Sequence, residues 1–126
     1  MAIKLDHAVI YAEDHDQAAR EFAWVMDLPL GRVAGEGYEF SAVRIHSELA
    51  IYFMNRDEGS LEQHMAFHVD GRTFDKMVKR LKKDGMAFGN SPFDTANQRT
   101  DHDFMPRGLF WTNRDGCLFE IITDAL

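Results

Sequence analysis

The chain has 126 residues and a formal net charge of −7, from 14 basic and 21 acidic side chains. Hydrophobic residues make up 45% of it, which is enough for a core of its own and fits a single domain over residues 1–126. The acidic excess argues against nucleic acid as a partner, because nucleic-acid-binding domains usually carry a basic excess. No apolar stretch could span a bilayer and no signal sequence is evident, so we expect a cytoplasmic protein without a membrane partner.

Cysteine and histidine usage limits the chemistry of any site. Cys117 is the single cysteine, so no internal disulfide can form, which fits a reducing compartment. Nothing near it indicates a reactive thiolate, and we expect it to be buried and inert. Because the chain has six histidines, a metal site here would use nitrogen and oxygen ligands.

The first half of the chain reads as a strand, a helix and two strands. Leu5–Tyr11 is a short apolar run typical of a buried strand. Asp14 then starts a helix as its N-cap, and the helix ends before the Leu-Pro-Leu-Gly stretch at 28–31. Tyr38–Ile45 and Leu49–Met54 follow as strands. The helix presents one apolar face, made by Ala18, Phe22, Val25 and Met26.

The second half has the same pattern. His64–Val69 reads as a strand, a helix begins near Thr73, and Gly85 follows its C-terminus. Gly108–Thr112 and Cys117–Thr123 read as two strands joined by a turn.

Equivalent positions in the two halves indicate an internal repeat. His64 follows His7 by 57 residues, and Asp84 follows Asp27 at the same spacing. We therefore predict two modules, at about residues 3–55 and 62–125. Alignment of their last turns makes Tyr52 the equivalent of Glu120.

Two loops interrupt the pattern. Residues 55–63 form a polar connection between the halves, and residues 91–107 are the longest stretch without periodicity. Loops of that length in compact domains are commonly functional or mobile.

Three residues that metals favour lie within predicted strands: His7, His64 and Glu120. Strand alternation puts each on one face, and the three converge if those faces point inward. Two imidazoles and a carboxylate suit a divalent metal such as Fe(II), Mn(II), Zn(II), Ni(II) or Co(II), and leave open positions for a substrate. In the alternative reading the histidines are structural or solvent-facing, and Glu120 forms an ion pair with Arg44 or Arg107.

The motifs at 5–11 (LDHAVIY), 64–69 (HMAFHV) and 112–123 (TNRDGCLFEIIT) together resemble the vicinal oxygen chelate superfamily. That superfamily includes glyoxalase I, extradiol dioxygenases, fosfomycin-resistance proteins and bleomycin-binding proteins. The resemblance implies an α+β fold in which two βαβββ modules form a cupped mixed sheet around a metal site. It also implies a homodimer, a small-molecule substrate with two neighbouring oxygens, and His7, His64 and Glu120 as the metal ligands.

Some residues of this chain differ from the motifs of particular members, and these differences indicate which member it resembles most. Tyr52 stands where glyoxalase I has a fourth ligand, and Val9 stands where fosfomycin-resistance enzymes have Thr. Bleomycin-binding relatives lack the ligands. Extradiol dioxygenases bind Fe(II) with two His and one Glu, although their usual Tyr is Phe110 here. We therefore favour an Fe(II)-dependent, dioxygenase-like enzyme. A glyoxalase-like lyase or isomerase, or a protein that binds a drug or metabolite without chemistry, remains the alternative.

Further residues complete the predicted site. We expect His68, Tyr11 or His102 to move protons during the reaction. Four residues are expected to contact the substrate, although each could instead be a core or surface residue: Arg107, Phe110, Trp111 and Tyr52. His15 and His46 read as surface residues.

Overall fold

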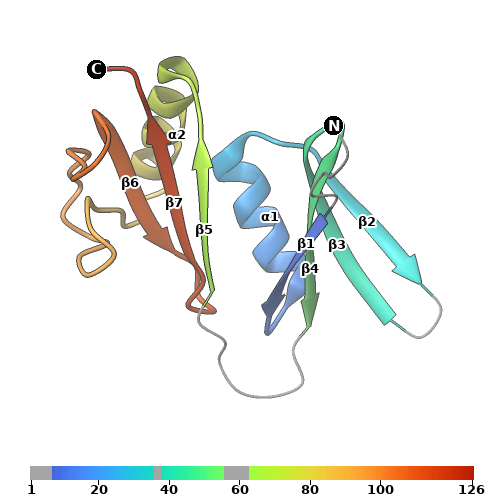
Figure 1. The fold of residues 1–126 in the computed structure, drawn as a ribbon. Helices are drawn as coiled ribbons and strands as arrows, with labels where there is room; N and C mark the ends of the chain where they lie inside the picture. Colours follow the sequence, from blue (N-terminus) through green and yellow to red (C-terminus); the bar gives the residue numbers. More distant parts are fainter. Residues whose placement is uncertain (1–6, 36–37, 56–62) are drawn as a thin grey trace. The chain divides into compact units, whose positions relative to one another are not determined.

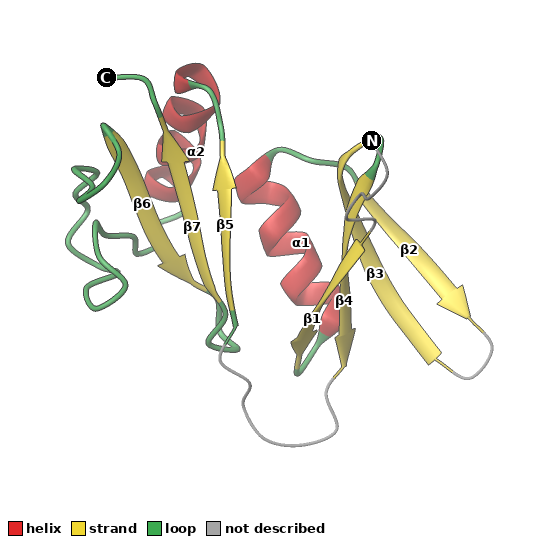
Figure 2. Ribbon diagram, in the orientation of Figure 1, coloured by secondary structure: helices red, strands yellow, loops and turns green. Residues whose placement is uncertain are grey.

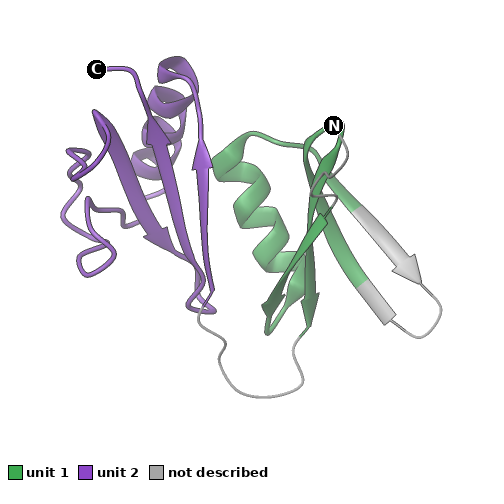
Figure 3. Cartoon of the chain, in the orientation of Figure 1, with its two compact units in different colours: residues 1–61 green, residues 62–126 purple. Residues whose placement is uncertain are grey.

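A computed structural model describes residues 7–35, 38–55 and 63–126. The chain is α+β and divides into two compact units, Met1–Leu61 and Glu62–Leu126 (Figures 1 and 3). Leu5 and Asp6 of the first predicted strand, and most of the predicted loop at 55–63, lie outside the described residues. None of the described helices is both long enough and apolar enough to cross a membrane.

The first unit is a βαβββ module, as expected. Its sheet has the strand order β1-β4-β3-β2, in which β1 and β4 run parallel and the other neighbours antiparallel. Its elements are β1 (His7–Ala12), α1 (His15–Met26), β2 (Leu30–Gly35), β3 (Tyr38–His46) and β4 (Leu49–Asn55).

Helix α1 forms where its cap and its apolar face predict it. The carboxylate of Asp14 accepts hydrogen bonds from the backbone N–H groups of Asp16 and Gln17, which satisfies two of the unpaired donors of the first turn. Asp27 ends the helix in the left-handed conformation, with φ of 56°. All four residues of the predicted apolar face are buried, and α1 packs on β3 and β4.

The second unit has one strand fewer. It comprises β5 (His64–His68), α2 (Gly71–Lys83), β6 (Arg107–Thr112) and β7 (Leu118–Thr123), with the strand order β5-β7-β6. A long loop between α2 and β6 takes the place of a further strand (Figure 2). Within this loop, Gly89 forms an isolated antiparallel bridge with Phe110 of β6, at the edge where a further strand would pair.

Strand β2 was not predicted from the sequence. Its sequence, LGRVAG, is rich in glycine and follows a proline, so it lacks the β-branched and aromatic residues typical of strands. It forms because β3 offers a free edge, along which Leu30 to Gly35 pair antiparallel with Val43 to Tyr38. Tertiary pairing therefore overrides a weak local preference.

The pairing of the strands shows which residues occupy equivalent positions in the two units. His7 is paired with Ala50, and His64 is paired with Leu118, so Ala50 and Leu118 occupy equivalent places. Two residues further along the same strands, Tyr52 is the equivalent of Glu120. This agrees with the equivalence inferred from the turns.

Each sheet buries one face. In β7, Phe119, Ile121 and Thr123 are buried, whereas the alternate residues, Leu118, Glu120 and Ile122, are only partly covered. Helix α2 packs against β7 and buries Phe74, Met77 and Leu81. The candidate ligand Glu120 therefore extends from the less buried face of the sheet.

Candidate functional site

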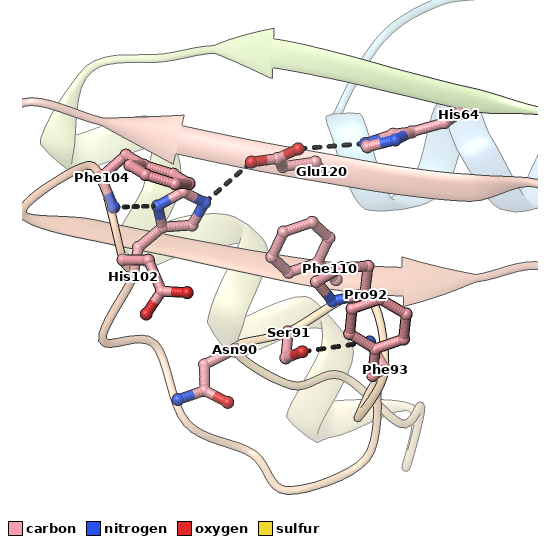
Figure 4. A pocket seen from close by; sticks show the side chains of 10 residues that line it. His64, Asn90, Ser91, Pro92, Phe93, His102, Phe104, Phe110 and Glu120 are labelled. Carbon is pink, nitrogen blue, oxygen red and sulfur yellow. Dashed lines mark hydrogen bonds and ion pairs between the residues drawn. The ribbon is translucent and has the colours of Figure 1, made fainter.

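Glu120 is central to the second unit. It lies on β7, between β5 and β6, and 15% of its side chain is exposed. Both of its carboxylate oxygens are engaged, one by a histidine of the neighbouring strand and one by a histidine of the long loop (Figure 4). Neither arginine considered from the sequence, Arg44 or Arg107, is its partner in these contacts.

His64 approaches Glu120 from the start of β5. Its Nε2 atom is 3.0 Å from Oε1 of Glu120, and half of its side chain is exposed. The parallel register of β5 and β7 creates this approach, because it pairs His64 with Leu118 and so places Glu120 one side-chain repeat further along the same face.

His102 approaches the carboxylate from the other side. Its Nε2 atom is 2.8 Å from Oε2 of Glu120, and only 6% of its side chain is exposed. The imidazole stacks on the ring of Phe110, with centroids 5.6 Å apart and planes 10° apart. Its Nδ1 atom accepts hydrogen bonds from the backbone N–H groups of Phe104 and Met105.

The long loop that carries His102 is held by backbone hydrogen bonds, both within the loop and to strand β6. Gln98 N donates to Phe88 O at 2.8 Å, and Gly108 N donates to Thr100 O at 2.9 Å. Arg99 also pairs with Asp101, and its hydrogen bonds hold the pKa of that carboxyl below its usual value. The bond between Thr100 and Gly108 thus joins the two chain segments that flank His102.

A cavity of about 410 Å³ opens beside the pair His64 and Glu120. Phe110, Phe93 and Phe104 line it, and of these Phe110 is buried whereas Phe93 and Phe104 are 97% and 89% exposed. Sequence reasoning missed Phe93, Phe104 and the loop residues Asn90 and Ser91. The available signal was an aromatic residue next to Pro92 within an otherwise polar loop.

The donor set fits a divalent metal in part. Two ligands that each lie about 2.1 Å from one metal, at right angles, are about 3.0 Å from one another. His64 Nε2 and Glu120 Oε1 have that separation. Within the described residues, no group of three or more His, Cys, Asp or Glu side chains is placed to hold a metal. The second unit therefore supplies two donors of the three expected.

His7 begins β1 in the first unit, where its ring stacks on Tyr52 with centroids 4.6 Å apart. Tyr52 also contacts the ring of Phe40. Tyr11, on the same face of β1 as His7, is 37% exposed. These residues form one surface of the first sheet, opposite the face that α1 covers.

No protein-family model matches the sequence, and no curated protein matches it either. Solved structures do match. The oxidase ChaP-H1 is 27% identical, with 97% of this chain and 96% of that chain covered and a TM-score of 0.86. A glyoxylase/bleomycin resistance protein/dioxygenase domain from Frankia sp. EAN1pec is 19% identical over 98% of both chains, with a TM-score of 0.68.

This chain has the vicinal oxygen chelate fold. A variant of the fosfomycin resistance protein FosX from Listeria monocytogenes, complexed with Mn(II) and 1S,2S-dihydroxypropylphosphonic acid, has the same fold. It is 19% identical over 100% of this chain and 94% of that chain, with a TM-score of 0.67.

Three other residues predicted for the site lie elsewhere in this vicinal oxygen chelate fold. Trp111 is fully buried and stacks on Phe119. Arg107 donates to Asp75 at 2.7 Å and to Ala125 O at 2.9 Å, and its guanidinium lies over the ring of Phe74. His68 lies further along β5 than His64, with its Nε2 atom 3.1 Å from Asp124.

One histidine differs from expectation. His15 is 9% exposed rather than at the surface, and its Nδ1 atom is 2.8 Å from the hydroxyl oxygen of the buried Ser41. Position alone misled the sequence reading, because the first residue of a helix is usually exposed. Here β3 packs against that end of α1 and covers it. His46 is exposed, as expected.

Proposed function

We propose that this protein is a divalent-metal-dependent enzyme acting on a small molecule with two neighbouring oxygens. His7, His64 and Glu120 are the proposed ligands, and Fe(II) is the favoured metal. The observation that carries the proposal is the 3.0 Å separation of His64 Nε2 and Glu120 Oε1 beside a cavity. A ligand pair at that spacing suits one metal ion.

Two further observations support the proposal. His7 occupies the place in β1 that His64 occupies in β5, so the repeat supplies a second imidazole on the corresponding face. Among structures of this fold, ChaP-H1 is described as an oxidase, and FosX was solved with Mn(II) and a vicinal diol. Both features agree with a metal site that receives adjacent oxygens.

The chain and the metal contribute different chemistry. A divalent metal held by these residues supplies Lewis acidity toward two substrate oxygens, and Fe(II) adds reactivity toward dioxygen. Glu120 supplies a negative charge that partly neutralises the cation. Phe110 and the projecting rings of Phe93 and Phe104 provide apolar walls, which favour a substrate with a flat apolar body and displace water from it.

The test is metal binding by matched histidine variants. We expect purified protein loaded anaerobically with Fe(II) to hold the metal, and His64→Ala to lose it. His68→Ala is the control, because His68 lies on the same strand face and is similarly exposed but pairs with Asp124. Retention of metal by His64→Ala at the level of the control would overturn the proposal.

Substrate tests separate the kinds of chemistry. Dioxygen uptake by the Fe(II)-loaded protein with a panel of catechols is the expected result. Turnover of hemithioacetals by the Ni(II)- or Zn(II)-loaded protein, without dioxygen uptake, would instead assign a lyase or isomerase. Binding of either class without turnover would assign a binding protein.

The proposal includes a homodimer, and the subunit origin of His7 can be tested by complementation. If His7 and His64 of one site come from different chains, mixing His7→Ala with His64→Ala under conditions that allow subunit exchange restores one of the two metal sites in each mixed dimer. With random exchange half of the dimers are mixed, so about a quarter of all sites is restored. No restoration, with a dimer seen by light scattering, assigns all three ligands to one chain. A monomer by light scattering would contradict the dimer.

A further inference from the structure

Gly108 and Phe40 occupy equivalent places in the two units but differ completely in size. Phe40 is paired two residues from Tyr52 across β3 and β4, just as Gly108 is paired two residues from Glu120 across β6 and β7. In the first unit the Phe40 ring contacts Tyr52, with centroids 4.9 Å apart. In the second unit there is no side chain at this place.

His102 fills the place that Gly108 leaves open. A Cβ atom added to Gly108 would lie 2.5 Å from Cδ2 and 3.0 Å from Cγ of His102, so the imidazole rests directly on the glycine backbone. The imidazole then contacts Glu120, as Phe40 contacts Tyr52 in the first unit. The loop thus delivers a polar ring to a position that the strand itself fills in the other unit.

The hydrogen bonds of His102 determine which ring nitrogen carries the proton. Nδ1 accepts from the backbone N–H groups of Phe104, at 3.1 Å, and Met105, at 3.3 Å, so it has no proton of its own. In the neutral ring the proton is then on Nε2, which donates to Oε2 of Glu120. With this donor role, Nε2 has no lone pair left to bind a metal.

We infer that His102 is a positioning residue that fixes Glu120 as a one-oxygen metal ligand. Its Nε2–H group occupies Oε2 and turns Oε1 toward His64. This inference rests on the proposed function. The stacked Phe110, the glycine backbone and the two backbone N–H groups hold the imidazole rigidly, so the carboxylate is oriented before a metal arrives.

Two substitutions of His102 distinguish its hydrogen bond to Glu120 from its hydrogen bonds to the loop backbone. In His102→Asn, the amide oxygen replaces Nδ1 as acceptor for the loop N–H groups, but the side chain is too short to reach Glu120. In His102→Gln, the amide N–H reaches about as far as Nε2 and replaces the donor to Glu120, while the loop acceptor is lost. Circular dichroism and thermal unfolding are the checks that each variant is folded.

The readout is the affinity for Mn(II) or Co(II) alone, measured by calorimetry. Loss of an outer hydrogen bond to a ligand typically weakens metal binding by about 10- to 100-fold. We expect that loss for His102→Asn, and a return to within about threefold of the unsubstituted protein for His102→Gln. Unchanged affinity in His102→Asn, or an equal loss in both variants, would overturn the inference.

A measurement on the metal-free protein distinguishes failure of the inference from failure of the proposed function. Nitrogen-15 NMR of the imidazole should show His102 protonated at Nε2 and unprotonated at Nδ1. Protonation at Nδ1 would overturn the positioning role even if the metal binds. If His64→Ala leaves metal binding intact while His102 has the expected tautomer, the metal proposal fails and the orientation of Glu120 by His102 stands.

Discussion

The imidazole of His7 lies against the phenol ring of Tyr52, with centroids 4.6 Å apart and planes 20° apart. The equivalent pair in the second unit is His64 and Glu120, joined by a 3.0 Å contact between Nε2 and Oε1. The two units thus place a histidine beside the same strand position, but only the second offers it a carboxylate. At this strand position the two units differ in residue chemistry, with Tyr52 in the first and Glu120 in the second, although the strand pairing around it is equivalent.

Replacing Tyr52 with Glu should give the first unit the missing carboxylate. The new side chain would lie next to His7, and a further oxygen ligand favours a hard or borderline divalent ion. We expect Tyr52→Glu to bind Ni(II) roughly tenfold more tightly, which corresponds to about 1.4 kcal/mol. Calorimetric titration measures it. Tyr52→Phe is the control, since it keeps the stacked ring and adds no ligand, and equal affinities of the two variants would contradict the prediction.

Gly108→Ala should destabilise the second unit, because the added Cβ atom meets the ring of His102 at 2.5 Å. Overpacking of this kind costs about 1–3 kcal/mol in the free energy of unfolding, measured with urea. Gly31→Ala is the matched strand control, since among the described residues its Cβ atom would approach Ala42 O alone, at 3.6 Å. We expect that control to change stability by no more than about 0.5 kcal/mol. Similar losses in both variants would argue against the close contact with His102.

Cys117 should make stability depend on alkaline pH. Burial, followed by the nearby Asp115 charge, raises the pKa of its thiol from 9.0 to about 12. Between those values the unfolded chain loses a proton that the folded chain keeps, so the thiol's contribution is intact below pH 9 and is lost as pH rises through 12. Relative to Cys117→Ala, which has no thiol, the free energy of unfolding should fall by about 1.4 kcal/mol per pH unit in this window. Parallel pH profiles for the two proteins would contradict this.

Asp70 should make helix α2 sensitive to acid. Its carboxylate accepts a 2.7 Å hydrogen bond from the backbone N–H of Thr73, and the hydrogen bonds to Thr73 lower its pKa below 3.8. A lowered pKa in the folded state stabilises the protein above the unfolded pKa, and this stabilisation is lost as pH falls through the folded value. Asp70→Asn keeps an acceptor that does not titrate, so its stability should vary less below pH 4. Thermal unfolding from pH 6 to pH 3 compares the two, and identical profiles would exclude the titration.

Local patterns in the sequence determined most of the elements. Apolar periodicity and the Asp14 cap predicted α1, and strand alternation put His64 and Glu120 on faces that do meet. The repeat also predicts that Tyr52 is the equivalent of Glu120, which the strand registers confirm. These features are predictable because neighbouring residues dictate helical and strand geometry, and because the two units repeat one plan.

Contacts between distant residues decided the rest. His102 reaches Glu120 only because the long loop folds back over the sheet. The sequence around Gly108 does not indicate that the ring of His102 packs against this glycine. Arg107 binds Asp75 and the C-terminal backbone, and His15 is covered by β3, because packing partners far apart in sequence set their surroundings. The sequence by itself determined which residues could form a site. Tertiary structure alone decided how the carboxylate at its centre is oriented, since hydrogen bonds from separate segments must meet there.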